Sequence, residues 1–349
     1  MSRRTLILLL TALLVLAVLA LVAGPGSHSG SDEQLLYPDL RAQLNDVRQI
    51  VVRGPGNQLI ATLERRETGW ILVERDYPAD VGRIRETLLA LAEARIVEEK
   101  TSTPDLYERL GVQDIALETA RGVQLEISGT RTPIRLIIGE AAGGSSDMGY
   151  VRRGGEPQSW LVSGRFTPGK TTGEWLDRQL LDIPATRIQA VIITHPGTDT
   201  LRLGKAARED TEFTVADIPA DRELSYPGVG NALGALLAGL QTDDVHGREA
   251  LGDNPGKPVV ARFHCFDGLI VEASAWRTPD GTRMSFLASI DPARAEGHAG
   301  ADAPASDAVR AEAAAINARL GGWIYTLPGH TTEQFTRRLQ DLLAPAATP

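Results

Sequence analysis

The sequence predicts an α+β protein in which an N-terminal transmembrane helix precedes two repeated units of mainly antiparallel sheet with helices packed on one face. Three observations lead to this prediction. A long apolar run lies near the N-terminus, one pattern of turns and strands occurs twice along the chain, and paired alternating segments flank tight turns.

The apolar run occupies residues 5–23 and follows Arg3 and Arg4. About 20 such residues are needed to cross the bilayer core as a helix, and flanking arginines stay on the cytoplasmic side. We therefore expect a transmembrane anchor over residues 1–23 and a tether over residues 24–43. A cleaved signal peptide is the alternative, although its apolar region is usually shorter. Both interpretations place the main domain in the periplasm, and the first makes the chain a single-pass protein of the inner membrane.

The composition narrows the class of partner and the source of stability. The net charge is −9, and no block of basic residues interrupts the acidic chain, which argues against a nucleic-acid partner. Cys265 is the only cysteine, so no disulfide framework holds the exported domain. We expect this thiol to be buried in a strand, and we expect stability to come from the apolar core.

The internal repeat is the clearest organising feature of the sequence. Residues 47–80 and 188–221 have the same arrangement of strands and turns. The dipeptides Pro55-Gly56 and Pro196-Gly197 are 141 residues apart, and so are the tripeptides that begin at Pro78 and Pro219. Equal spacing between a turn and the next helix start is what a duplicated unit predicts. Asp80 is expected at or beside a helix start, whereas the second helix is expected several residues after Asp221, because Pro227 intervenes.

The two copies continue in parallel after these tripeptides. Each has an apolar stripe at helical spacing, then paired alternating strands, then a strand that begins at Trp160 or Trp323, a Pro-Gly loop and a final amphipathic helix. Asp267-Gly268 marks a tight hairpin turn in the second copy. The predicted units cover residues 44–182 and 184–345, and the second carries an insertion over 291–320 that ends in an alanine-rich helix. The helical stripes consist of Ile84, Leu88, Leu91 and Ala92 in the first copy and of Leu233, Leu236, Leu237 and Leu240 in the second.

Residues 164–171 match the spacing of a phosphate-binding P-loop, G-x-x-x-x-G-K-[ST]. The second copy argues for another interpretation, because it replaces Lys170 with His330 and keeps the rest of the loop. Both copies have a threonine followed three residues later by Glu174 or Gln334, which is the pattern of a helix capping box. We therefore predict that Thr171 and Thr331 start helices and that the chain binds no nucleotide cofactor.

No pattern of residues indicates a catalytic, cofactor-binding or metal site. The six histidines lack the spacing of zinc ligands, and no serine lies in a G-x-S-x-G sequence. His195 in a Pro-Gly turn and His264 on the outer face of a strand are both expected to be solvated, as is the acidic pair Asp243-Asp244.

Several short motifs occur in a characteristic order in the first two thirds of the chain. They are Gly69-Trp70-x-Leu72, Pro78-Ala79-Asp80, Tyr107-x-x-Leu110-Gly111-Val112, Ile138-Gly139, Tyr150-Val151-Arg152 and Trp175-Leu176-Asp177-Arg178. In these motifs the chain resembles the bacterial membrane-anchored family catalogued as domain of unknown function 4340. The resemblance implies an auxiliary component of gliding-motility-type ABC transporters, with a transporter permease as partner. It carries over no functional residue.

Two functions are compatible with these observations. The first is a non-enzymatic periplasmic accessory or binding protein of the cell envelope, auxiliary to an ABC-type transport system. The second is an exported enzyme of the hydrolase type whose catalytic groups are scattered across the fold. A deep pocket with convergent titratable groups would favour the enzyme.

Overall fold

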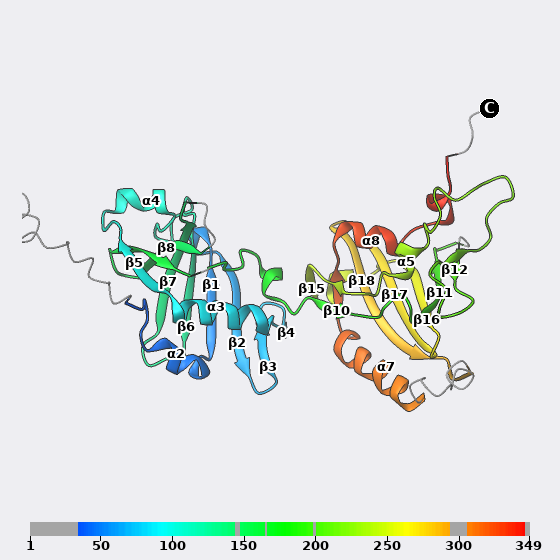
Figure 1. Ribbon diagram of the computed structural model, residues 1–349, viewed down its shortest axis with the longest axis horizontal. Helices are drawn as coiled ribbons and strands as arrows, with labels where there is room; N and C mark the ends of the chain where they lie inside the picture. The colour runs from blue at the N-terminus through cyan, green and yellow to red at the C-terminus, as the bar shows by residue number, and fades with distance from the viewer. Residues whose placement is uncertain (1–33, 144–146, 165, 198–199, 294–305, 346–349) are drawn as a thin grey trace, which may run out of the picture. The chain divides into compact units, whose positions relative to one another are not determined.

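The computed structural model describes residues 34–143, 147–164, 166–197, 200–293 and 306–345 (Figure 1). These residues form two compact units. One contains the described residues of Met1–Arg65 and Gly82–Lys170, and the other contains Arg66–Val81 and the described residues of Thr171–Pro349. The boundary expected between the two repeats, near residue 183, differs from this division at Arg66–Val81 and at residues 171–182, which both group with the second unit.

The first sheet is built from nine strands, of which β3 and β4 belong to the segment that groups with the second unit. The strands are β1 (Gln49–Arg53), β2 (Leu59–Arg66), β3 (Gly69–Leu72), β4 (Tyr77–Pro78), β5 (Arg95–Glu99), β6 (Val123–Ser128), β7 (Ile134–Ala141), β8 (Met148–Arg153) and β9 (Ser159–Ser163).

The second sheet is built from eight strands, and a separate two-stranded sheet joins β10 to β14. The strands are β10 (Gln179–Leu181), β11 (Ile188–Thr194), β12 (Thr200–Gly204), β13 (Thr214–Val215), β14 (Leu240–Gln241), β15 (Asp244–His246), β16 (Val259–Cys265), β17 (Leu269–Thr278), β18 (Gly281–Ile290) and β19 (Ile324–Thr326).

The helices are few, and most of them are short. The α-helices are α2 (Leu40–Gln43), α3 (Val81–Glu93), α4 (Tyr107–Leu110), α5 (Asn231–Gly234), α7 (Ser306–Leu320) and α8 (Gly329–Phe335). Single 3₁₀ turns are η1 (Leu44–Asp46), η2 (Pro55–Asn57), η3 (Pro104–Leu106), η4 (Thr172–Trp175), η5 (Arg248–Leu251) and η6 (Leu339–Leu342). The prediction of an α+β fold with mainly antiparallel sheets is therefore confirmed.

The strand order is the same in the two large sheets. The first runs β4-β3-β2-β1-β6-β7-β8-β9-β5, and the second runs β13-β12-β11-β16-β17-β18-β19-β15. Apart from β4, each strand of the first sheet has a counterpart in the second whose label is ten higher. In both, one strand, β5 or β15, is placed at the far edge of the sheet beyond β9 or β19, although it precedes β6–β9 or β16–β19 in the sequence.

The core of each unit comes from alternation along strands and from a helical stripe. In the first unit, α3 lies across the sheet and buries Ile84, Leu88, Leu91 and Ala92, as the spacing predicts (Figure 1). In the second, the ring of Phe335 from α8 packs against Phe263 and Phe286 of the sheet at 5.8 and 6.0 Å. Cys265 is buried in β16, as expected, and Asp267-Gly268 forms the turn to β17.

The alanine-rich helix of the insertion is present as α7, and its polar side chains hold it to the sheet. Asn317 makes two hydrogen bonds of 2.7 Å with the backbone of Ala288 in β18. Arg187, which precedes β11, donates two hydrogen bonds to Glu312 of α7 and one of 2.7 Å to Asp267. Residues 294–305 of the insertion lie outside the described residues.

The second helical stripe differs from its prediction. Leu233, Leu237 and Leu240 are buried as core residues, but α5 ends at Gly234, and Leu240 lies in strand β14. Glycine weakens a helix, and Gly239 takes a backbone conformation with φ of 59°, which ends helical geometry before Leu240. Apolar spacing therefore identified the core positions here but not the local structure.

The N-terminal predictions fall largely on residues that are not described. The anchor at 1–23 and the tether up to residue 33 lie outside the described residues, within which no helix is long and apolar enough to cross a membrane. The rest of the expected tether, residues 34–43, is folded. Leu36 is fully buried, so its apolar side chain belongs to the core of the first unit. Its backbone N–H donates to the carbonyl of Ala94 at 2.8 Å, which holds this segment to the unit.

The segment Arg66–Val81 makes specific contacts within the second unit. The Arg75 guanidinium donates two hydrogen bonds of 2.8 Å to the Asp244 carboxylate. The Tyr77 ring is 2% exposed and meets the rings of Trp323 and Tyr325 edge-on at 5.3 and 6.4 Å. Asp80 lies directly before α3, as predicted, and its N–H donates to the carbonyl of Trp175 at 2.8 Å.

Candidate functional site

The P-loop-like segment does not have the architecture of a nucleotide site. The strand before it, β9, pairs antiparallel with both β8 and β5, and the helix after it is the single 3₁₀ turn η4. A P-loop instead connects a strand to an α-helix whose N-terminal N–H groups face the phosphates. Residue 165 lies outside the described residues.

The two predicted capping boxes are wrong in their hydrogen bonds. Thr171 does precede η4, but its hydroxyl donates to the Glu174 carboxylate at 3.0 Å and caps no backbone N–H. Thr331 lies inside α8, which starts at Gly329 after Pro328. The helix starts earlier because the Pro328 carbonyl accepts the N–H groups of Thr331 and Thr332, so no threonine cap is needed.

The histidines are more enclosed than the sequence suggested. His195 is only 7% exposed, and its Nε2 lies 3.3 Å from the carbonyl oxygen of Arg337, so the expectation that it is solvated is wrong. The chain after α8 covers this end of β11, a long-range contact that a local turn pattern does not reveal. His264 is half-buried on β16. Within the described residues no three metal-binding side chains come together.

The acidic pair Asp243-Asp244 is engaged in ion pairs instead of being merely solvated. Asp243 accepts from Arg178 at 2.6 Å, and Asp244 accepts from Arg75. Burial raises the pKa of Asp244, but the hydrogen bonds from Arg75 and from the N–H of Val245 outweigh it and hold that pKa below its usual value. Burial lowers the pKa of the neighbouring His246, so this imidazole favours its neutral form.

A polar pocket opens beside His195 in the second unit, and we take it as the candidate site. Its volume is about 380 Å³. It lies where β11, β16 and β17 reach one end of the sheet and where the segment after α8 crosses them. The polar side chains that line it are those of His195, Lys257, Arg277, Thr282, Thr336 and Arg338.

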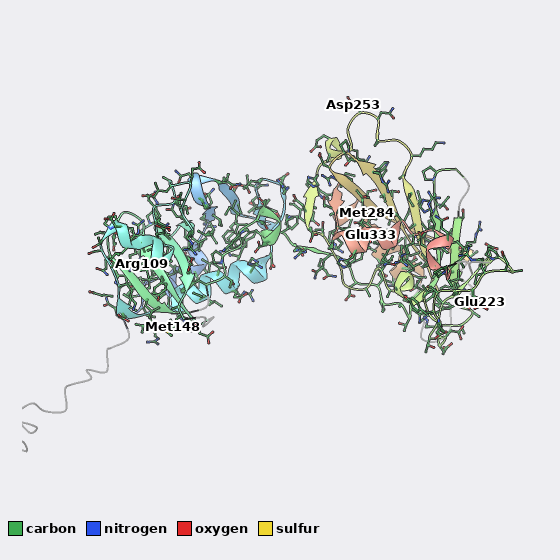
Figure 2. The ribbon with its side chains drawn as sticks, turned by 90° about the horizontal axis from the view of Figure 1, so that it is seen from above. Arg109, Met148, Glu223, Asp253, Met284 and Glu333 are labelled. Atoms are coloured by element: carbon green, nitrogen blue, oxygen red, sulfur yellow. The ribbon has the colours of Figure 1, made fainter. Side chains whose placement is uncertain are left out.

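The strand register explains why these groups converge. Val259 of β16 pairs with Ala275 of β17, and two residues further along β17 Arg277 pairs with Thr282 of β18. Side chains two residues apart on a strand share a face, so Arg277 extends the face on which Ala275 is buried. The buried Met284 of β18 belongs to the same row as Ala275 (Figure 2). The pocket is therefore the polar end of the core of the second unit.

Three cations line this pocket, and no carboxylate does. Lys257 comes from the loop that carries Asp253 at its outer turn (Figure 2), Arg277 from the end of β17, and Arg338 from the start of η6. Within the described part of the chain, Lys257 and Arg277 form no ion pair with an acidic side chain. Like charges that gather without counter-charges repel one another, which is a cost that a bound anion removes.

Other hollows carry fewer converging polar groups. A broad one of about 610 Å³ lies along α3 beside Leu89, and a smaller one of about 230 Å³ lies against Tyr37 and Pro133. The first is wide open, and the second is lined mainly by apolar atoms. The pocket beside His195 is therefore the described hollow best suited to hold a polar ligand.

Three of the motifs that suggested the family, those at residues 107–112, 138–139 and 150–152, form a structural cluster in the first unit. The Arg152 guanidinium lies 4.7 Å from the centre of the Tyr107 ring and donates to the carbonyls of Val112 and Glu156 at 2.9 and 3.1 Å. Gly111 takes a left-handed conformation with φ of 68° and ends α4, which a residue with a side chain adopts only with strain. These residues hold the loop after α4 against the sheet and leave no open site.

These features define a class of protein, a paired-unit α+β protein with antiparallel sheets and a cationic pocket in its second unit. A family model described as Domain of unknown function (DUF4340) matches residues 70–255. This match covers more than half of the chain, and the chain belongs to that family. Comparisons with curated proteins and with solved structures gave no match.

The sequence did not point to the pocket. Its cations are spread from residue 257 to residue 338, and none of them lies in a recognisable motif. The dipeptide Arg337-Arg338 is not a distinctive signal, because the chain also contains Arg65-Arg66 and Arg152-Arg153. It gave no indication that Lys257 and Arg277 would lie beside it.

Proposed function

We propose that the protein is a non-enzymatic binding protein of the cell envelope that acts as an accessory subunit of an ABC-type transport system. Its N-terminal helix anchors it in the inner membrane, and its two α+β units lie in the periplasm. Its partner in this proposal is a permease subunit of the transporter.

The observation that carries the proposed binding role is the pocket beside His195. Its lining offers cations and hydroxyl groups, which hold a ligand by charge and hydrogen bonding. The Nε2 of its one imidazole faces a backbone carbonyl. The anchored location is supported by Arg3-Arg4 and the apolar run at 5–23, and the transporter association by the family resemblance.

We also infer that the two units arose by duplication of one ancestral unit. The support is the shared strand order, including the unusual edge position of β5 and β15. The pocket lined by three cations belongs to the second copy, which fits a division of roles. The first unit would then serve contacts with the partner and the second would hold the ligand.

The accessory role is tested by affinity purification of the full chain from detergent-solubilised membranes, with partners identified by mass spectrometry. We expect permease and ATP-binding subunits of one transporter to co-purify, and we expect the protein to stay in the membrane fraction after a high-salt wash. Release into the soluble periplasm would contradict the anchor. Membrane retention without any transporter subunit would contradict the accessory role.

A further inference from the structure

We propose that the pocket beside His195 binds a small oxyanionic ligand with at least two negative charges, such as a phosphate monoester or a polycarboxylate. This inference rests on the proposed binding role and adds the class of ligand. Three features of the pocket carry it, namely its charge, its hydrogen-bond donors and its size.

The charge of the pocket is opposite to that of the chain. The protein has a net charge of −9, yet the pocket gathers Lys257, Arg277 and Arg338 and includes no acidic side chain. A cation at the end of a sheet often extends its charged head into water. Two of these cations have no acidic partner among the described residues, and they line a hollow together instead of diverging. An anion with two charges matches this arrangement better than one with a single charge.

The donors in the pocket suit oxygen acceptors. A guanidinium presents parallel N–H groups that match the oxygens of phosphate and carboxylate, and an ammonium adds a compact charge. The hydroxyl of Thr282 supplies a further donor to the same space, whereas that of Thr336 donates to the Thr332 carbonyl at 3.3 Å. His195 is nearly buried at the wall, where it is fixed by the Arg337 carbonyl. The pocket therefore combines a nearly buried imidazole with the exposed heads of Lys257 and Arg277.

The size of the pocket indicates a small molecule. A volume of about 380 Å³ lies at the lower end of the range of small-molecule sites, and it leaves no room for a folded partner. Partial enclosure by the sheet and by the chain after α8 excludes part of the water, which strengthens each charge interaction relative to an open surface. The expected ligand is therefore a soluble metabolite-sized anion.

Binding is tested by isothermal titration calorimetry on the full chain in detergent. The probes are inorganic phosphate, glycerol 3-phosphate and citrate, with glucose as the neutral control and a short-chain phosphatidylglycerol to represent a lipid headgroup. We expect saturable binding of at least one soluble probe, weakened by added salt, and no binding of glucose. Binding of glucose with equal affinity, or of the lipid probe alone, would overturn the assignment.

Variants locate the binding in the pocket. Lys257→Ala and Arg277→Ala should each weaken the binding of the soluble anion at least about tenfold, and Arg277→Lys should retain part of it. Arg248→Ala, which removes an exposed arginine of η5 outside the pocket, is the matched control and should leave the affinity unchanged. Because Lys257 and Arg277 are exposed, both variants should unfold at the wild-type temperature.

Two outcomes would count against the site. Equal affinity in wild type and in Arg277→Ala would place the anion elsewhere, and no saturable binding of any soluble anion would remove the inference altogether. Neither result touches the co-purification of transporter subunits, which tests the accessory role separately. Loss of both binding and co-purification in wild-type protein would overturn the two proposals together.

Discussion

A buried cation of the first unit and two exposed cations of the second are used in opposite ways. In the first, Arg152 is buried, lies against the Tyr107 ring and gives its N–H groups to backbone carbonyls. In the second, Lys257 and Arg277 are exposed at a pocket and meet no acidic side chain among the described residues. The comparison teaches that a cation stabilises the fold when its N–H groups bond to other groups of the protein. A cation whose N–H groups have no such partner is available to bind a ligand. Predictions about single cations can break or sharpen this distinction.

The largest effect is expected at Arg187, which meets two carboxylates. Asp267 is only 3% exposed, so Arg187→Ala would leave a buried carboxylate without its guanidinium. We expect a loss of about 3–5 kcal/mol in the free energy of unfolding, measured by urea denaturation. A loss below about 1 kcal/mol would show that this cation is not part of the fold. Arg310→Ala, which breaks an exposed pair within α7, is the matched control and should cost little.

The next largest effect is expected at Arg152. Replacement by methionine keeps much of the volume but leaves the carbonyls of Val112 and Glu156 without their donors. We expect about 2–3 kcal/mol of lost stability, because buried carbonyls lose charged partners and the contact with Tyr107 disappears. An unchanged midpoint in chemical denaturation would place Arg152 among the dispensable cations.

A smaller effect is expected at the pair between Arg75 and Asp244, because both side chains remain about one quarter exposed. A double-mutant cycle with Arg75→Ala and Asp244→Ala should give a coupling energy of about 1 kcal/mol. Zero coupling would mean that the two hydrogen bonds seen here do not contribute to the stability of the second unit.

The same region gives a pH dependence with a definite sign. The pKa of His246 is lowered in the folded protein by burial, so the unfolded state binds the proton more tightly. Stability should therefore fall as the pH drops below about 6.5, the usual histidine value. The lowered pKa of Asp244 adds a further loss near and below its usual value of about 4. The stability of His246→Asn, measured by denaturation at several pH values, should no longer fall below about pH 6.5. It should still fall near and below about pH 4, where Asp244 is protonated.

The smallest effect is expected for the pocket cations themselves. Without ligand, Arg277→Ala should change the free energy of unfolding by less than about 0.5 kcal/mol, and removing repulsion from Lys257 can even raise it slightly. Thermal denaturation of the variant beside wild type, without added anion, measures this. A loss of 2 kcal/mol or more, on the order of that for a buried cation, would show that Arg277 supports the fold and would weaken the distinction between the units.

Local sequence patterns predicted those parts of the fold that depend on neighbouring residues. The hairpin at Asp267-Gly268, the helix start after Asp80 and the buried thiol of Cys265 all follow from periodicity and turn chemistry. The prediction at Leu233–Leu240 placed apolar residues in the core but gave the wrong structure, because glycines at 234 and 239 limit the helix.

The candidate site could not be predicted, because it depends on contacts between distant segments. His195 is buried by residues more than a hundred positions away, and the cations that line the pocket come from three separate segments. Residues 34–43 gave a different error, since Leu36 and Leu40 were assigned to a tether although both are buried.

The division of the chain into units has a consequence for how the protein is made. Residues 66–81 are synthesised well before most of their partners in the second unit, yet Leu72 and Tyr77 are buried in the folded chain. During synthesis from the N-terminus, the ring of Tyr77 cannot meet Trp323 and Tyr325 until those residues have been made. The interval leaves apolar surface and a strand edge that can pair with other chains, which is the situation that chaperones relieve. A chain truncated after residue 182 would leave the Tyr77 ring without these two partners, so its solubility would suffer even though it contains all the strands of the first sheet.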